Sequence, residues 1–114
     1  IIIEVCKCND GHGGEGLYQT YKQAASPKDV EEEILKVKME DTIADQWESQ
    51  ILARILSRHK VFFVADEGTK EILEDMHIEY SSSVEDAIKK AIEIKGKDAK
   101  IAVIPDGVSV IVNK

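Results

Sequence analysis

The stretch Thr42–Ala65, TIADQWESQILARILSRHKVFFVA, decides the fold, because an amphipathic helix in it leads directly into a short apolar strand. Apolar side chains recur every four positions along the helix, at Ile43, Trp47, Ile51 and Ile55. This spacing places them on one side of a helix that we expect to pack inward as far as about Arg58. Thr42 and Asp45 have the spacing of a capping box and predict where the helix begins. The strand that follows, Lys60–Ala65, is expected to be buried.

Outward from this stretch, the chain keeps alternating between strand and helix. Apolar runs predict three further strands, at Ile1–Cys6, Ile78–Tyr80 and Lys100–Ile104. The first of them is expected to be buried on both faces. Further helices are predicted at about Leu17–Gln23, from Ser26 to Lys38, at Thr69–Met76 and from Ser83 to Gly96. Ser26 is the expected N-cap of one helix, and Ser82 and Ser83 precede Glu85 and Asp86 as the capping box of another. The mostly polar helix after Ser26 is expected on the surface.

This alternation predicts a single α/β domain of three layers with a mainly parallel sheet. Pro105-Asp106-Gly107 predicts a turn, after which Val108–Val112 is expected to return as the antiparallel hairpin partner of the last strand. The 114 residues suffice for one domain. Because the chain opens at Ile1, inside an apolar run, we expect it to be an excised C-terminal piece of a longer protein.

Charge and cysteine content exclude several classes of partner. The formal net charge is −7, and the basic residues are interleaved with acidic ones, which disfavours nucleic acid and anionic membrane surfaces. Apolar runs stay well short of the ~20 residues that span a bilayer. Cys6 and Cys8 would point to opposite faces of a strand, so a disulfide between them is expected to be poor. With two cysteines and no disulfide framework, we expect a cytoplasmic protein.

The loop NDGHGGEG, residues 9–16, is the first candidate site. Gly11, Gly13 and Gly16 match G-x-G-x-x-G between a predicted strand and a predicted helix, the context in which a pyrophosphate binds. Carboxylates at Asp10 and Glu15 argue against a phosphate there, and a tight loop that needs positive φ angles explains the glycines equally well.

Metal binding is a second possibility at the same loop. Cys6, Cys8 and His12, together with Asp10, are metal-capable side chains within seven residues. A closed structural zinc site needs four ligands, and the other histidines, His59 and His77, are isolated in the sequence. We therefore expect no metal site built by this chain alone.

The segment DQWESQ, residues 45–50, is the third candidate. Gln46 and Gln50 share a helical face with Ser49 and Ala53. Polar amides near a helix N-terminus can bind a carboxylate or hydroxyl group of a ligand. The alternative is an ordinary solvated helix face.

Five segments occur together in an order that resembles one protein family. They are the loop Asp10–Gly13, the helix Asp45–Leu56, the strand Val61–Val64, the helix start Ser83–Ala87 and the ending Ile104–Gly107. Over nearly the whole chain they resemble the C-terminal domain of the nickel-dependent lactate racemase family. The DQWESQ helix and the closing IPDG are the specific parts of this resemblance.

The resemblance implies a two-domain cytoplasmic enzyme whose N-terminal domain holds a nickel-pincer nucleotide, attached to a lysine and ligated by a histidine. The implied reaction is reversible hydride transfer from C2 of a 2-hydroxy acid to the pincer ring, with histidines as general acid and base. The C-terminal domain closes the cleft and contributes substrate contacts. Because the cofactor and catalytic positions of the family lie upstream of Ile1, the resemblance implies no catalytic residue in this chain.

Two motifs match the family residue by residue. Gln46 matches a glutamine on the cleft-facing helix, and Asp10 and His12 match the glycine-loop motif. Some members have a lysine about one turn after that glutamine, where this chain has Ser49. A lysine would pair with a carboxylate and a serine cannot, so lactate is not singled out among 2-hydroxy acids.

The expected function is therefore the substrate-side domain of a nickel-pincer-dependent 2-hydroxy-acid racemase or epimerase, inactive without the N-terminal domain of the same polypeptide. The candidates for the substrate cleft are Asp45, Gln46, Trp47, Ser49 and Gln50, and the loop candidates are Asp10, Gly11, His12 and Gly13. One alternative is a stand-alone module that binds a nucleotide or phosphate at Gly11–Gly16. Another is an interaction domain whose DQWESQ face packs only against its parent protein.

Overall fold

A parallel sheet of three strands forms the centre of the computed structural model, which describes residues 1–9, 11–44, 46–107 and 109. The strands are β1 (Ile2–Val5), β2 (Val61–Val64) and β3 (Glu79–Ser81), in the order β1-β2-β3. Ile2 is aligned with Val61, and Phe62 with Glu79. The parallel α/β architecture is thus confirmed.

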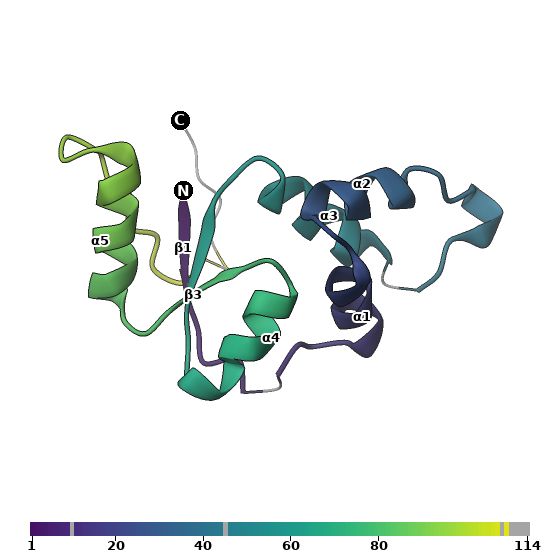
Figure 1. Cartoon of the computed structure of the whole chain (residues 1–114), viewed down its shortest axis with the longest axis horizontal. Helices are drawn as coiled ribbons and strands as arrows, with labels where there is room; N and C mark the ends of the chain where they lie inside the picture. Colours follow the sequence, from purple (N-terminus) through teal and green to yellow (C-terminus); the bar gives the residue numbers. More distant parts are fainter. Residues whose placement is uncertain (10, 45, 108, 110–114) are drawn as a thin grey trace.

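Helices cover both faces of the sheet (Figure 1). They are α1 (Glu15–Gln23), α2 (Pro27–Ile34), α3 (Gln46–Leu56), α4 (Lys70–Asp75) and α5 (Val84–Lys95). Short 3₁₀ turns, η1 (Met39–Asp41) and η2 (Glu67–Thr69), precede α3 and α4. Figure 1 shows α5 on one side of the strands and α1 to α4 on the other, which makes three layers.

The predicted C-terminal hairpin is not present in the part of the chain that the structure describes. Residues 100–104 form no strand, and the three strands that do form are all parallel. Ile101, Val103 and Ile104 are exposed. Val108 and residues 110–112 of the expected return strand lie outside the described residues. An apolar run becomes a strand only where a neighbouring strand accepts its hydrogen bonds, and the described residues provide none here.

Strand β1 is more exposed than its apolar sequence predicts. Ile2 and Val5 are both exposed, so the expected burial on two faces is wrong. The strand lies at the edge of the three-stranded sheet, with β2 beside it. An edge strand has a neighbouring strand on one side only, so its side chains contact fewer other residues. In central β2, Val61 and Phe62 are buried.

Serine caps start two helices as expected. Ser26 Oγ accepts a hydrogen bond from the Asp29 amide at 3.2 Å, and Ser83 Oγ accepts one from the Asp86 amide at 3.1 Å. The predicted cap at Thr42 is wrong. Its hydroxyl donates back to the carbonyl of Lys38 at the start of η1 (3.4 Å), and α3 begins only at Gln46, four residues further on. Helix α2 also ends earlier than expected, at Ile34.

The inward face of α3 differs from the predicted stripe. Ile43, Trp47 and Ile51 are exposed, whereas Ser49 and Ala53 are 5 % and 0 % exposed. Ile55, with Leu52 and Leu56, does pack against the core. Small side chains at 49 and 53 allow close approach to α1 and α2, which supply the buried Tyr21 and Val30. A hydropathy pattern favours large apolar residues and misses such a contact.

Tyr21 fixes α1 to α3. Its hydroxyl donates a hydrogen bond to the Ser49 backbone carbonyl at 2.8 Å, and its side chain is fully buried. Burial also raises the pKa of the Tyr21 phenol, which keeps the donor proton in place.

We expect Tyr21→Phe to lower the free energy of unfolding by about 0.5–1.5 kcal/mol, because the buried hydrogen bond from the hydroxyl to the Ser49 carbonyl in α3 is lost. Urea unfolding followed by circular dichroism measures this difference. Tyr80→Phe is the matched control, since the hydroxyl of Tyr80 makes no hydrogen bond to another described residue. Equal stability of the two variants would show that the Tyr21 bond contributes nothing.

Candidate functional site

The glycine loop lies at the carboxyl end of β1, the edge at which parallel α/β sheets bind ligands. Gly11 and Gly13 have φ angles of +68° and +79°, which side chains other than glycine rarely adopt. The Gly11 amide donates to the Cys8 carbonyl at 3.0 Å. Asp10, the remaining loop candidate, lies outside the described residues.

His12 is placed by α1. Its ring stacks on Tyr18 with centroids 4.7 Å apart and planes 9° from parallel. Nε2 lies 3.5 Å from a carboxylate oxygen of Glu15. Nδ1 is buried and has no hydrogen-bond partner among the described residues. A buried ring nitrogen without a partner is costly, and a ligand or another domain could supply one.

Helix α1 is joined to α4 by a charged network around Asp75. Tyr18 donates its hydroxyl proton to the Asp75 carboxylate, and Lys22 Nζ lies 2.8 Å from the same carboxylate oxygen. Lys22 also donates to the Tyr18 hydroxyl at 2.9 Å. Hydrogen bonds from Lys22 and then Tyr18 hold the pKa of Asp75 below its usual value. The network fixes the ring on which His12 stacks.

The second candidate site is the beginning of α3. Gln46 is half-buried at the first helical position, where the positive end of the helix dipole favours an anion. Trp47 is 59 % exposed, and Gln50 is exposed as well. Ser49 is buried towards α1, so the structure separates it from the solvent-facing glutamines. Asp45 lies outside the described residues.

Helix α1 connects the two candidate segments. Tyr18 on this helix contacts His12 in the glycine loop, and Tyr21 is bonded to Ser49 in α3. The sequence analysis missed both tyrosines, because nothing in their local pattern distinguishes them from other tyrosines of a helix.

The alternative ligands of the glycine loop gain no support. Gly16 lies inside α1, and Glu15 occupies its first turn, where its carboxylate would repel a pyrophosphate. Among the described residues, no three His, Cys, Asp or Glu side chains gather as metal ligands. Cys6 and Cys8 lie together, but His12 is stacked on Tyr18.

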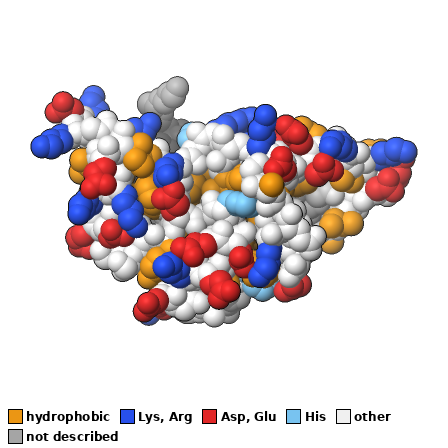
Figure 2. Space-filling model, in the orientation of Figure 1, with side chains coloured by type: hydrophobic (Ala, Val, Ile, Leu, Met, Phe, Trp, Pro, Cys, Tyr) orange, Lys and Arg blue, Asp and Glu red, His pale blue; other side chains and the backbone are white. Residues whose placement is uncertain are grey.

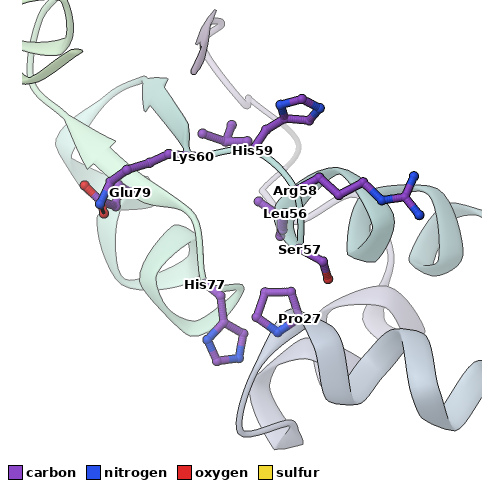
Figure 3. A pocket seen from close by; sticks show the side chains of 9 residues that line it. Pro27, Leu56, Ser57, Arg58, His59, Lys60, His77 and Glu79 are labelled. Carbon is purple, nitrogen blue, oxygen red and sulfur yellow. Dashed lines mark ion pairs between the residues drawn. The ribbon is translucent and has the colours of Figure 1, made fainter. Parts of the chain in front are cut away.

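A hollow of about 430 Å³ lies at the opposite end of the sheet, where β2 and β3 begin (Figure 3). Its lining includes Ser57, Arg58, His59, Lys60, His77 and Glu79. Lys60 is paired with Glu79, and Arg58 lies 3.9 Å from Glu31. His77 Nε2 is 3.1 Å from the Ala24 carbonyl oxygen. The charged side chains around this hollow are therefore largely paired with other groups of the protein.

The face of the molecule that Figure 2 shows does not resemble a polyanion-binding surface. Figure 2 shows acidic and basic side chains interspersed over the visible face, without a continuous basic patch. No helix in the described part of the chain is long and apolar enough to cross a bilayer.

Comparison with known proteins identifies the family. Residues 1–112 match the family described as the lactate racemase C-terminal domain. This chain belongs to that family. As a lactate racemase C-terminal domain, it is 47 % identical over 114 residues to a lactate racemase of Thermoanaerobacterium thermosaccharolyticum. It is 41 % identical over 111 residues to a lactate racemase of Lactiplantibacillus plantarum.

The fold of this lactate racemase C-terminal domain agrees with that of a solved relative. The structure of the lactate racemase apoprotein from Thermoanaerobacterium thermosaccharolyticum matches with a TM-score of 0.95 at 48 % identity, over 99 % of this chain. The match covers 27 % of that chain. The two sequence matches include 100 % and 97 % of this chain. They span only 27 % and 26 % of the length of the two relatives.

We expect Asp75→Asn to lower the melting temperature at neutral pH, because Lys22 and Tyr18 lose a carboxylate partner. The lowered pKa of Asp75 means that its contribution is present above the unfolded-state pKa and is lost as the pH falls through the folded-state pKa. The difference should therefore vanish in acid. Thermal unfolding across a pH series tests this, with Glu71→Gln on the same helix as the control. A difference that does not depend on pH would contradict it.

Proposed function

We propose that this chain is the substrate-side, C-terminal domain of a cytoplasmic 2-hydroxy-acid racemase or epimerase that depends on a nickel-pincer nucleotide. The observation that carries the proposal is membership of the lactate racemase C-terminal domain family over residues 1–112. The chain spans about a quarter of its curated relatives, which is consistent with a larger N-terminal domain in the same polypeptide.

The start of α3 is the surface of this domain that suits a 2-hydroxy acid. Gln46 offers an amide that can donate to a carboxylate or accept from a hydroxyl. The N-terminus of the eleven-residue helix adds a partial positive charge beside it. We assign Gln46 a substrate contact, with Trp47 and Gln50 at the border of the cleft. Asp45 remains a candidate from the sequence, and buried Ser49 supports the helix from behind.

The exposed apolar side chains beside Gln46 favour an interface with the N-terminal domain. Ile43, Trp47 and Ile51 are exposed, as is Met39 in the preceding 3₁₀ turn. Exposed apolar side chains that lie close together often mark a contact with another domain. Covering them would also exclude water from a cleft at Gln46, which strengthens polar contacts to a substrate.

Among the described residues, no three potential metal ligands gather. As the family resemblance implies, we assign the cofactor and the catalytic groups to the N-terminal domain, and expect this chain to be inactive alone. The substrate is proposed as a 2-hydroxy acid. Ser49 stands where some members carry a lysine, but it is buried towards α1, so it does not single out lactate among 2-hydroxy acids.

We expect Gln46→Ala in the intact polypeptide to lower kcat/KM by about tenfold to a hundredfold, as is typical when a hydrogen bond to a charged group is lost. Thermal stability should change little, because Gln46 is only half-buried at a helix end. Racemisation assays on a panel of 2-hydroxy acids measure the effect. Gln23→Ala, an exposed glutamine at the end of α1, is the control. Unchanged kinetics would remove Gln46 from the site.

The polypeptide isolated from its source cells tests the larger assignment. We expect an intact mass far above 12.7 kDa and about one nickel per chain. A larger chain without nickel would contradict the cofactor but leave the domain assignment intact. A native chain near 12.7 kDa would contradict the two-domain enzyme and favour a small binding module at residues 11–16. Calorimetry with nucleotides would then measure that binding.

A further inference from the structure

Cys6 and Cys8 form a close thiol pair just after β1. Their Sγ atoms lie 3.2 Å apart, within hydrogen-bond distance for thiols. The sequence predicted sulfur atoms on opposite faces of a strand, but β1 ends at Val5. Cys8 then adopts a left-handed conformation with φ of +51°, which returns its side chain towards Cys6. The expectation that the two side chains point to opposite faces is therefore wrong, and both thiols are free.

The backbone on both sides of the pair is held in place. The Cys6 amide donates to the Val64 carbonyl at 3.1 Å, which anchors it to the central strand. The Cys8 carbonyl accepts from Gly11 at 3.0 Å, which anchors it to the glycine loop. Left-handed backbone is unfavourable for residues other than glycine, so a non-glycine residue held in it is unusual. Both cysteines are free and half-buried, so neither is sealed in the core.

We infer that Cys6-Lys7-Cys8 is a thiol–disulfide exchange site, in which a small-molecule disulfide of the glutathione class oxidises the pair to an intramolecular disulfide. This inference does not depend on the proposed racemase activity. The two sulfur atoms already lie in contact, so the disulfide requires no rearrangement of the helices or strands.

The exchange has two steps that balance. The Cys8 thiolate attacks one sulfur of the external disulfide, which forms a mixed disulfide and releases one small thiolate. Cys6 then loses its proton to solvent, and its sulfur attacks Cys8 Sγ and displaces the second small thiolate. The two protein thiols are oxidised, and the external disulfide is reduced to two thiols. An excess of small thiol reverses both steps.

The order of the steps follows from the surroundings of the sulfur atoms. Burial, and next the hydrogen bond with Cys8, raise the pKa of Cys6 to about 12. Cys6 is therefore a poor first nucleophile. Once Cys8 is in the mixed disulfide, its sulfur is no longer a thiol that hydrogen-bonds to Cys6. Cys6 then lies next to the sulfur that it must attack.

The experiment uses the intact polypeptide, equilibrated with reduced and oxidised glutathione in varied ratio and then quenched in acid. Free thiols are alkylated, and the peptide that contains residues 6–8 is mapped by mass spectrometry without cutting after Lys7. We expect Cys6 and Cys8 to lose alkylation together, with loss of two hydrogens and no attached glutathione. Cleavage after Lys7 should then leave two peptides that separate only after reduction.

Single variants separate the two roles. Cys6→Ser should stop at a stable glutathione adduct on Cys8. In Cys8→Ser, Cys6 should be alkylated slowly, because burial raises the pKa of its thiol and little thiolate is present. Independent alkylation of the two thiols in the unmodified protein would overturn the inference. So would a lasting glutathione adduct or a disulfide between two chains.

Discussion

The buried contact between Tyr21 in α1 and the backbone of α3 at Ser49 is the constraint on which the rest of the arrangement depends. It sets the rotation of α3 about its own axis. With Ser49 and Ala53 turned towards α1 and α2, Trp47 and Ile51 must face outward. The same helix α1 carries Tyr18, which supports His12 in the glycine loop. One short helix therefore positions both segments that the family resemblance singled out, although it belongs to neither.

As far as Gly96, the sequence was sufficient for the order of the α-helices and strands and for their kind. Short apolar runs identified β2 and β3, and serine caps placed the start of α2 and α5 correctly, because both signals are local. The exposure of β1 and the missing strand at residues 100–104 were not predictable in this way. Whether an apolar run becomes a buried strand depends on neighbours far away in the chain.

The candidate site shows the same division between local and distant information. Gln46 lies near the N-terminus of α3, as the sequence pattern predicted. Gly11 and Gly13 adopt the positive φ angles that a tight glycine loop predicts. The stacking of His12 on Tyr18 and the approach of the two cysteine sulfurs depend on single backbone torsions and on helix packing. The exposed apolar side chains near Trp47 looked like core in the sequence, and apolar periodicity alone does not say which partner covers them.

The pairing of β1 with β2 has a consequence for how the domain folds. Ile2 lies beside Val61, so the first two strands meet across nearly half of the chain. Closing a loop of that length costs entropy before any strand hydrogen bond repays it. The helices α1, α2 and α3 fill the intervening segment and contact one another. Their association can shorten the effective loop, which favours pairing of β1 with β2 after the helices have packed. During synthesis on the ribosome, β1 must wait without a partner until β2 has emerged, and the time spent waiting is set by translation rather than by diffusion.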